Sequence, residues 1–205
     1  MLKEIFTALV SRYSADAVLT EKLWAEIEKA YSGKKRHYHN LHHLENMYNE
    51  LLPLQDSITD WDTLLFSLFY HDIVYKATSK DNEEKSAGVA AQRLAEIKYP
   101  TKKINKCYSQ IVATKLHELS PNTDTNLLTD ADLAILGANW DTYSNYSNAV
   151  RKEYSIYPDF LYKPGRTKAL QHFLQMDDIF KTAHFKGKYQ KESYTNLKKE
   201  LTLLI

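Results

Sequence analysis

The stretch W61-DTLLFSLFYHDIV-Y75 is apolar on almost every side when it is drawn as a helix. A helix that is apolar all round is buried among other elements of a globular protein. A buried parallel strand also presents a continuous apolar run, but such strands are usually about 4–8 residues long and this run is longer. We therefore predict a central buried helix around which most of the chain packs.

Helical periodicity extends outward from this stretch in both directions. Apolar residues recur at spacings of three and four, and the five glycines and five prolines fall between the periodic segments. The other expected helices cover residues 2–13, 21–31, 39–52, 79–99, 101–119, 127–137, 143–157, 167–180 and 191–204. Thr20 is the expected N-cap and Gly33 the expected terminator of the helix at 21–31, and Gly137 is the expected C-cap of the helix at 127–137. Residues 120–126 are expected to form a loop. Because strand alternation, repeats and linkers are absent from the pattern, we predict one all-α domain over residues 1–205.

Composition limits the class of protein. The formal net charge of +1 and the mixing of acids with bases argue against polymeric nucleic acid as a partner, although a small phosphate pocket remains compatible. Cys107 is the single cysteine, so neither a disulfide framework nor a cysteine-based zinc site is expected. No run approaches the roughly 20 apolar residues of a membrane span, and the first residues do not resemble a signal peptide. We expect a cytoplasmic protein without a membrane partner.

Histidines concentrate in R36-HYHNLHHLEN-M47, which holds four of the eight in the chain: His37, His39, His42 and His43. Histidine binds divalent metals as a neutral ligand and transfers protons near neutral pH. His39 and His43 are four residues apart, so a helix would place them on one face about one turn from each other. Taken alone, a pair at this spacing more often consists of packing or capping residues.

Acidic residues interrupt two apolar segments farther along the chain. His71 and Asp72 end the central run, where a carboxylate is costly to bury without a partner such as a cation. Asp130 and Asp132 lie within LLTDADLAILG. If they do not bind a cation, Asp130 is a helix N-cap and Asp132 a carboxylate in the first turn of that helix. A histidine, a His-Asp pair and a distant aspartate form a mixed nitrogen and oxygen ligand set. Such a set suits Mn, Mg, Fe, Ni, Co or Zn with open coordination positions.

The order of these motifs resembles the HD-domain superfamily of metal-dependent phosphohydrolases, and in particular a small bacterial group of predicted phosphohydrolases. The matching motifs are RHYHNLHHLENM, FYHDIVY, DNEEKSA, TDADLAILG, VRKEY and NLKKEL. They extend from about residue 36 to residue 205. The resemblance implies a helical bundle of the HD-domain type.

The resemblance also implies roles for individual residues. It assigns these metal ligands: His43, His71, Asp72 and Asp132. Asp130 is the second candidate for the last of them. The stretch YHNLHH is also similar to the Y-H-N-x-x-x-H pattern of cyclic-nucleotide phosphodiesterases, a related branch, which implies that His39 is the proton donor.

The implied reaction is hydrolysis of a small phosphate ester, such as a nucleotide, by a phosphomonoesterase or a phosphodiesterase. A metal-activated water would attack phosphorus, Asp72 or Asp132 would orient that water, and His39 would protonate the leaving oxygen. The alternative is a non-catalytic HD protein that binds a metal or a nucleotide as a sensor or as a partner-binding module.

Six further residues are candidates for substrate binding: Arg36, Lys76, Glu83, His117, Arg151 and Arg166. The four cations would stabilise charge on the phosphoryl oxygens, whereas solvated faces and local ion pairs are their alternatives. Glu83 would contact a cation or the substrate, or be a favourable first-turn acid. His117 would serve a second metal, or be an exposed residue at a helix end. The tyrosines between residues 143 and 157 recur at helical spacing, which favours packing over stacking on a base.

Overall fold

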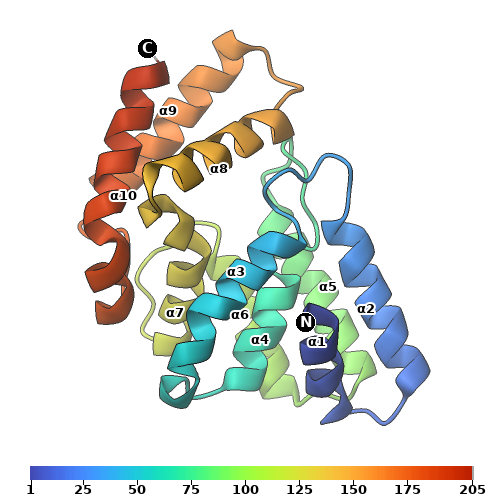
Figure 1. The fold of residues 1–205 in the computed structure, drawn as a ribbon. Helices are drawn as coiled ribbons and strands as arrows, with labels where there is room; N and C mark the ends of the chain where they lie inside the picture. The colour runs from blue at the N-terminus through green and yellow to red at the C-terminus, as the bar shows by residue number, and fades with distance from the viewer. Residues whose placement is uncertain (205) are drawn as a thin grey trace.

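The computed structural model describes residues 1–204, and these residues form α-helices and two short 3-10 helices with no strand among them (Figure 1). The helices are α1 Leu2–Ser11, α2 Ala17–Tyr31, α3 Leu41–Leu51, η1 Leu52–Ser57, α4 Trp61–Tyr70, α5 Asn82–Glu96, α6 Thr101–Ala113, α7 Thr123–Leu133, η2 Ala134–Gly137, α8 Trp140–Glu153, α9 Asp159–Gln175 and α10 Ala183–Leu204. The prediction of an all-α fold is confirmed.

Helix α4 is the central element, as its apolar sequence predicts. Every residue from Thr63 to Tyr70 is buried, and the helix contacts α3, α5, α6 and α7. Burying each large apolar side chain contributes about 1.5–3 kcal/mol, so this ten-residue helix supplies much of the stabilisation of the core. Asp60 caps its first turn by accepting a hydrogen bond from the Thr63 amide. The helix ends where the His71-Asp72 pair begins.

Helices α8, α9 and α10 form a second layer beside α7, on the side away from α1 and α2 (Figure 1). Helix α10 packs against α9 and η2, and α8 also contacts η2. At the last residue of η2, Gly137, the backbone lies so close to Tyr189 that an added Cβ would be 2.5 Å from the Tyr189 Cβ. Gly137 does end a helix, but it has no positive φ, and the close approach is what requires glycine.

Several helix starts differ from the sequence prediction because their caps are local side-chain contacts. Helix α2 begins at Ala17, since Asp16 and not Thr20 accepts the hydrogen bond that caps it. The expected loop at residues 120–126 is instead half helical, because Asn122 caps α7 through the Thr125 amide.

The C-terminal helices also begin earlier than predicted. Helix α9 starts at Asp159, eight residues before the expected position, and passes through Pro164 and Gly165. Helix α10 starts at Ala183, eight residues before the expected Lys191. In both segments the surrounding helices outweigh the weak local preference of glycine, proline and polar residues.

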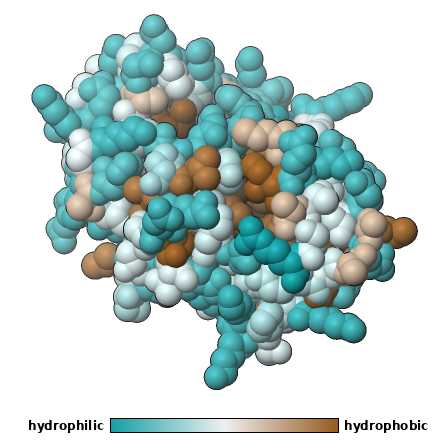
Figure 2. All heavy atoms as spheres, turned by 60° about the horizontal axis from the view of Figure 1, so that its bottom comes forward, coloured by the Kyte–Doolittle hydropathy of each residue, from teal (hydrophilic) through white to brown (hydrophobic). Residues whose placement is uncertain are grey.

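Polar side chains cover most of the face in Figure 2, and apolar side chains gather near its middle. Among residues 1–204, no helix combines the length and the apolar character that crossing a bilayer would need.

Candidate metal centre

Three side chains converge at the ends of three helices. The Nε2 atom of His43 lies 3.3 Å from Nε2 of His71 and 3.1 Å from Oδ1 of Asp132. The Nε2 atom of His71 lies 3.8 Å from the same oxygen. Both histidines are almost fully buried, and the three ligand atoms lie within 4.8 Å of one another. Residues far apart in the sequence therefore present two nitrogens and one oxygen to a single point.

The local structure directs the Nε2 atom of each histidine toward the other ligand atoms. Asn40 caps α3 through the His42 and His43 amides, which sets His43 in the first turn of the helix. His71 follows the last turn of α4, and its Nδ1 lies 2.8 Å from the Leu68 carbonyl oxygen. A carbonyl oxygen only accepts, so Nδ1 carries the proton and Nε2 of a neutral His71 keeps its lone pair for a ligand bond.

Asp72 lies beside His71 at the edge of this cluster. Its Oδ2 lies 3.4 Å from Nε2 of His71. Burial opposes ionisation of Asp72 and Asp132, but the charges and hydrogen bonds of the neighbouring histidines outweigh it and hold the pKa of each carboxyl well below its usual value. Burial alone would lower the pKa of His71, but the charge and hydrogen bond of Asp72, the charge of Asp132 and the Leu68 carbonyl together outweigh it and raise that pKa to about 9. Two ionised carboxylates thus create a field that favours a cation.

Burial lowers the pKa of His43, so this imidazole is neutral at pH 7 and suited to bind a metal. The donor set of two imidazole nitrogens and carboxylate oxygens fits a divalent transition metal or Mg²⁺, with positions left for other ligands. The residues that the HD pattern implies as ligands, His43, His71, Asp72 and Asp132, therefore lie together and fit such an ion chemically.

Glu153 is the principal residue that the sequence did not reveal. Its Oε2 lies 2.6 Å from Nδ1 of His39 and accepts a hydrogen bond from the Tyr75 hydroxyl at 2.8 Å. Its Oε1 accepts from the backbone amides of Tyr38 and His39. The Tyr75 ring stacks on the His39 ring at 4.2 Å between centroids. His39 is thereby fixed, with its Nε2 3.9 Å from Oδ2 of Asp72.

Electrostatics favour a protonated His39. Burial would lower the pKa of His39, but the charges of Asp72 and Glu153 outweigh it and raise that pKa. Hydrogen bonds from His39 and from two backbone amides lower the pKa of Glu153 to about 2 against the opposing effect of burial. A signal for Glu153 existed in the sequence: it lies seven residues after Tyr146 and three after Val150, which puts a charge on the apolar face of the expected helix.

His117 is brought to the centre, although it follows the end of α6. Its Nε2 lies 2.8 Å from Oδ2 of Asp132, the oxygen that does not face His43. The residue has a φ of 52°, a left-handed conformation that is uncommon outside glycine. His117 is buried and not the exposed helix-end residue of the alternative interpretation. It orients the Asp132 carboxylate.

Glu83 lies in the first turn of α5 and is half-buried. Burial raises its pKa, and the charge of Asp72 adds to the effect. Contact of Glu83 with a cation or the substrate, which the DNEEKSA motif suggests, stays a prediction.

Arg36 has a supporting position beside the centre. Its guanidinium donates hydrogen bonds to the carbonyl oxygens of His39, Asp72 and Ile73, at 3.1, 2.6 and 3.0 Å respectively. Since these carbonyls belong to the two segments that carry the catalytic candidates, Arg36 ties the segments together.

Of the other three candidate cations, Arg151 and Arg166 form ion pairs within the protein and Lys76 is exposed. Arg151 donates to the Asp159 carboxylate and to two carbonyl oxygens at the end of α8. Arg166 forms a two-pronged ion pair with Glu200 of α10, at 2.7 and 2.9 Å. Lys76 is exposed and follows the His71-Asp72 loop. Of these three residues, Lys76 is the most exposed, and binding of the substrate by any of them stays a prediction.

Asp130 lies apart from the three converging ligands. It is fully buried and accepts hydrogen bonds from the Lys181 amide, the Thr182 amide and the Thr182 hydroxyl, all between 2.7 and 2.8 Å. These contacts fix the start of α10. Of the two aspartates that the sequence left open, Asp132 is the one at the centre.

No family model, no curated protein and no solved structure matches this chain.

Proposed function

We propose that this chain is a metal-dependent phosphohydrolase of the HD-domain type that cleaves a small phosphate ester. The observation that carries the proposal is the convergence of His43, His71 and Asp132, with a charged histidine beside them. The carboxylates of Asp72 and Glu153 raise the pKa of the buried His39 imidazole, which favours the protonated form that a general acid needs. Hydrolysis of an ester needs such a group, because the leaving oxygen must acquire a proton.

Each residue has a distinct role in this proposal. A divalent cation held by His43, His71, Asp72 and Asp132 would stabilise charge on the phosphoryl oxygens and make water more acidic. Asp72 accepts the proton of the attacking water at Oδ2. His39 donates its Nε2 proton to the leaving oxygen, while Glu153 keeps the Nδ1 proton and the ring orientation fixed.

The test measures metal content and hydrolysis in the same samples. We would compare the wild type with His43→Ala and Asp72→Ala, each incubated with Mn²⁺, and assay a panel of phosphate monoesters and cyclic nucleotides. His42→Ala is the matched control, because His42 is the exposed neighbour of His43 on the same helix. We expect metal and turnover to be lost in the first two variants and kept in the third.

Two results would overturn the proposal. Metal retained in all the variants would mean that this cluster is not the metal site. Metal bound by the wild type without turnover of any ester would support the alternative, a metal-binding protein of the same fold without catalysis.

A further inference from the structure

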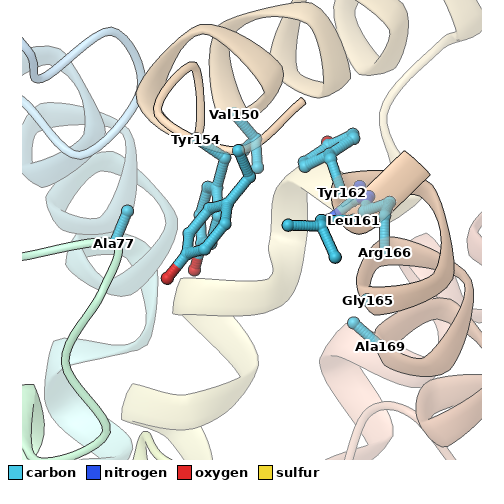
Figure 3. Close-up of a pocket in the computed structure, with 9 residues that line it drawn as sticks. Ala77, Val150, Tyr154, Leu161, Tyr162, Gly165, Arg166 and Ala169 are labelled. Carbon is cyan, nitrogen blue, oxygen red and sulfur yellow. The ribbon is translucent and has the colours of Figure 1, made fainter. Parts of the chain in front are cut away.

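A cavity of about 310 Å³ lies between the loop that follows Asp72 and helices α8 and α9 (Figure 3). Its lining is mostly aromatic and aliphatic and includes Val150, Tyr154, Tyr157, Leu161, Tyr162 and Arg166. In Figure 3, Tyr154, which directly follows α8, projects into the space between Ala77 and α9. Volumes from about 300 Å³ upward are typical of pockets for small ligands.

The Tyr154 wall of this cavity connects to the proposed proton donor. Tyr154 directly follows Glu153, whose carboxylate lies 2.6 Å from Nδ1 of His39. Tyr75 stacks on His39 and donates to Glu153. A ligand against Tyr154 would therefore lie beside the residue that holds the proposed proton donor.

The α9 wall connects to the other side of the metal centre. Leu161, Gly165, Ala169 and Phe173 follow one another at intervals of four residues, so they share one face of α9. The first three line the cavity, and the ring of Phe173 lies 6.0 Å from that of His117, the partner of Asp132. Both walls of the cavity thus continue along the chain into residues that contact the centre: Glu153 after Val150 and before Tyr154, and Phe173 after Ala169.

The chemistry of the lining favours an uncharged, flat occupant. Arg166 is the single cation among the lining residues, and its guanidinium donates two hydrogen bonds to the carboxylate of Glu200. Its charge is therefore balanced within the protein and is not directed at an anion. Three tyrosine rings provide stacking surfaces, and each hydroxyl can donate or accept one hydrogen bond at the edge of a ring.

We propose that this cavity binds a planar aromatic group of the substrate, with the dimensions of a nucleobase, while the phosphate of the same molecule lies at the metal centre. The proposal rests on the proposed phosphohydrolase function for the position of the phosphate. The shared chemistry is a flat aromatic ring system. It could belong to a nucleotide or to another aryl phosphate, and the test distinguishes the two.

The cavity has room for a substitution that fills it. A Cβ added at Gly165 would meet no atom within 4 Å, and Ala169 lies one turn farther along the same face. Ala169→Trp would place an indole where the ring of the substrate would stack. Lys168→Trp is the matched control, because it adds the same side chain to an adjacent exposed position of α9 that does not line the cavity.

The first experiment measures kcat/KM of the Mn²⁺-loaded protein for methyl phosphate, 1-naphthyl phosphate and adenosine 5′-monophosphate. Stacking of one base on an aromatic side chain contributes about 1–3 kcal/mol, so we expect a preference of about tenfold or more for at least one aromatic ester. Ala169→Trp should remove that preference and leave methyl phosphate within about twofold of the wild type. Lys168→Trp should change neither value. Equal losses for methyl and aromatic esters in Ala169→Trp would overturn the proposal.

The second experiment separates the cavity from the chemistry. Equilibrium binding of 1-naphthol and adenosine, which carry no phosphate, is measured for the wild type, Ala169→Trp and Gly165→Leu. Binding that both variants weaken supports the cavity even where no ester is hydrolysed, in which case only the proposed function fails. Binding that neither variant changes overturns the cavity assignment. Thermal unfolding of each variant verifies that it is folded.

Discussion

The Nδ1 atom of His39 lies 2.6 Å from a carboxylate oxygen of Glu153, although the two residues are 114 positions apart in the chain. The contact joins the segment before α3 to the last residue of α8. Glu153 also accepts two backbone hydrogen bonds from the same segment, so its position defines where the histidine points. The last residue of α8 therefore holds the proposed proton donor in place.

Glu153→Gln should lower kcat by about 10²-fold, the usual contribution of a positioned general acid. The amide keeps the shape of the side chain but removes the charge that raises the pKa of His39. Since a general acid must be protonated, the alkaline limb of the pH–rate profile should move to lower pH. Tyr75→Phe, which removes one hydrogen bond to Glu153 and leaves its charge, should shift that limb far less. Unchanged profiles in both variants would contradict a positioning role for Glu153.

The same carboxylate should make stability depend on acidity. The pKa of Glu153 is about 2 in the folded protein, against a value of 4.5 for the unperturbed group. A lowered pKa adds stability above pH 4.5 that is lost as pH falls toward 2, because the unfolded chain takes up the proton first. The shift corresponds to about 3 kcal/mol. Urea unfolding at pH 6 and pH 3 should therefore show a smaller difference for Glu153→Gln than for the wild type, and parallel losses would refute the assignment.

Gly137→Ala should destabilise the fold by about 1–3 kcal/mol through overpacking. The new Cβ would be 2.6 Å from the Tyr189 carbonyl oxygen and 2.8 Å from the Tyr189 Cα, both of them backbone atoms with little freedom to move. Gly88→Ala is the control, since a Cβ there meets nothing within 4 Å and alanine favours a helix interior by about 1 kcal/mol over glycine. Chemical unfolding of the two variants should give changes of opposite sign; a neutral Gly137→Ala would mean that α10 can shift away from η2.

Chelation should lower the thermal stability of the metal-loaded wild type. A ligand that binds only the folded protein adds about 2.7 kcal/mol when its concentration is 100 times Kd. Asp132→Asn removes one anionic oxygen from the three converging ligands, so its unfolding temperature should respond little to Mn²⁺ or to EDTA. Differential scanning calorimetry with and without EDTA gives the comparison. An equal response to EDTA in wild type and variant would place the stabilising metal elsewhere in the protein.

The sequence predicts the fold and part of the site for different reasons. Seven of the ten residues of α4 are apolar and require burial whatever surrounds them, so this helix is predictable without knowledge of its partners. The grouping of His43, His71 and Asp132 follows from the order of recognisable motifs. The structure confirms that these residues lie together, whereas the activity stays a proposal.

Contacts between distant segments were beyond the reach of the sequence. Helical spacing puts Glu153 on the apolar face of α8, but only the fold shows that its partners there are Tyr38 and His39. In the same way, Arg36 resembles a free phosphate-binding cation until its guanidinium meets the carbonyls of Asp72 and Ile73. Helix limits also failed where a single side chain, such as that of Asp16, satisfies the first amides.

The two aspartates of TDADLAILG should separate stability from metal binding. Asp130→Ala leaves the Lys181 and Thr182 amides without their acceptor at the start of α10. Hydrogen bonds to a charged group contribute about 1.5–3 kcal/mol each, so we expect a loss of several kcal/mol in urea unfolding. Because α7 still presents Asp132 to His43 and His117, the folded fraction of this variant should bind Mn²⁺ with nearly wild-type stoichiometry. Asp132→Asn should show the reverse: weak metal binding with a smaller change in the stability of the metal-free protein. If Asp130→Ala lost metal while remaining folded, the assignment of Asp132 as the ligand from α7 would be wrong.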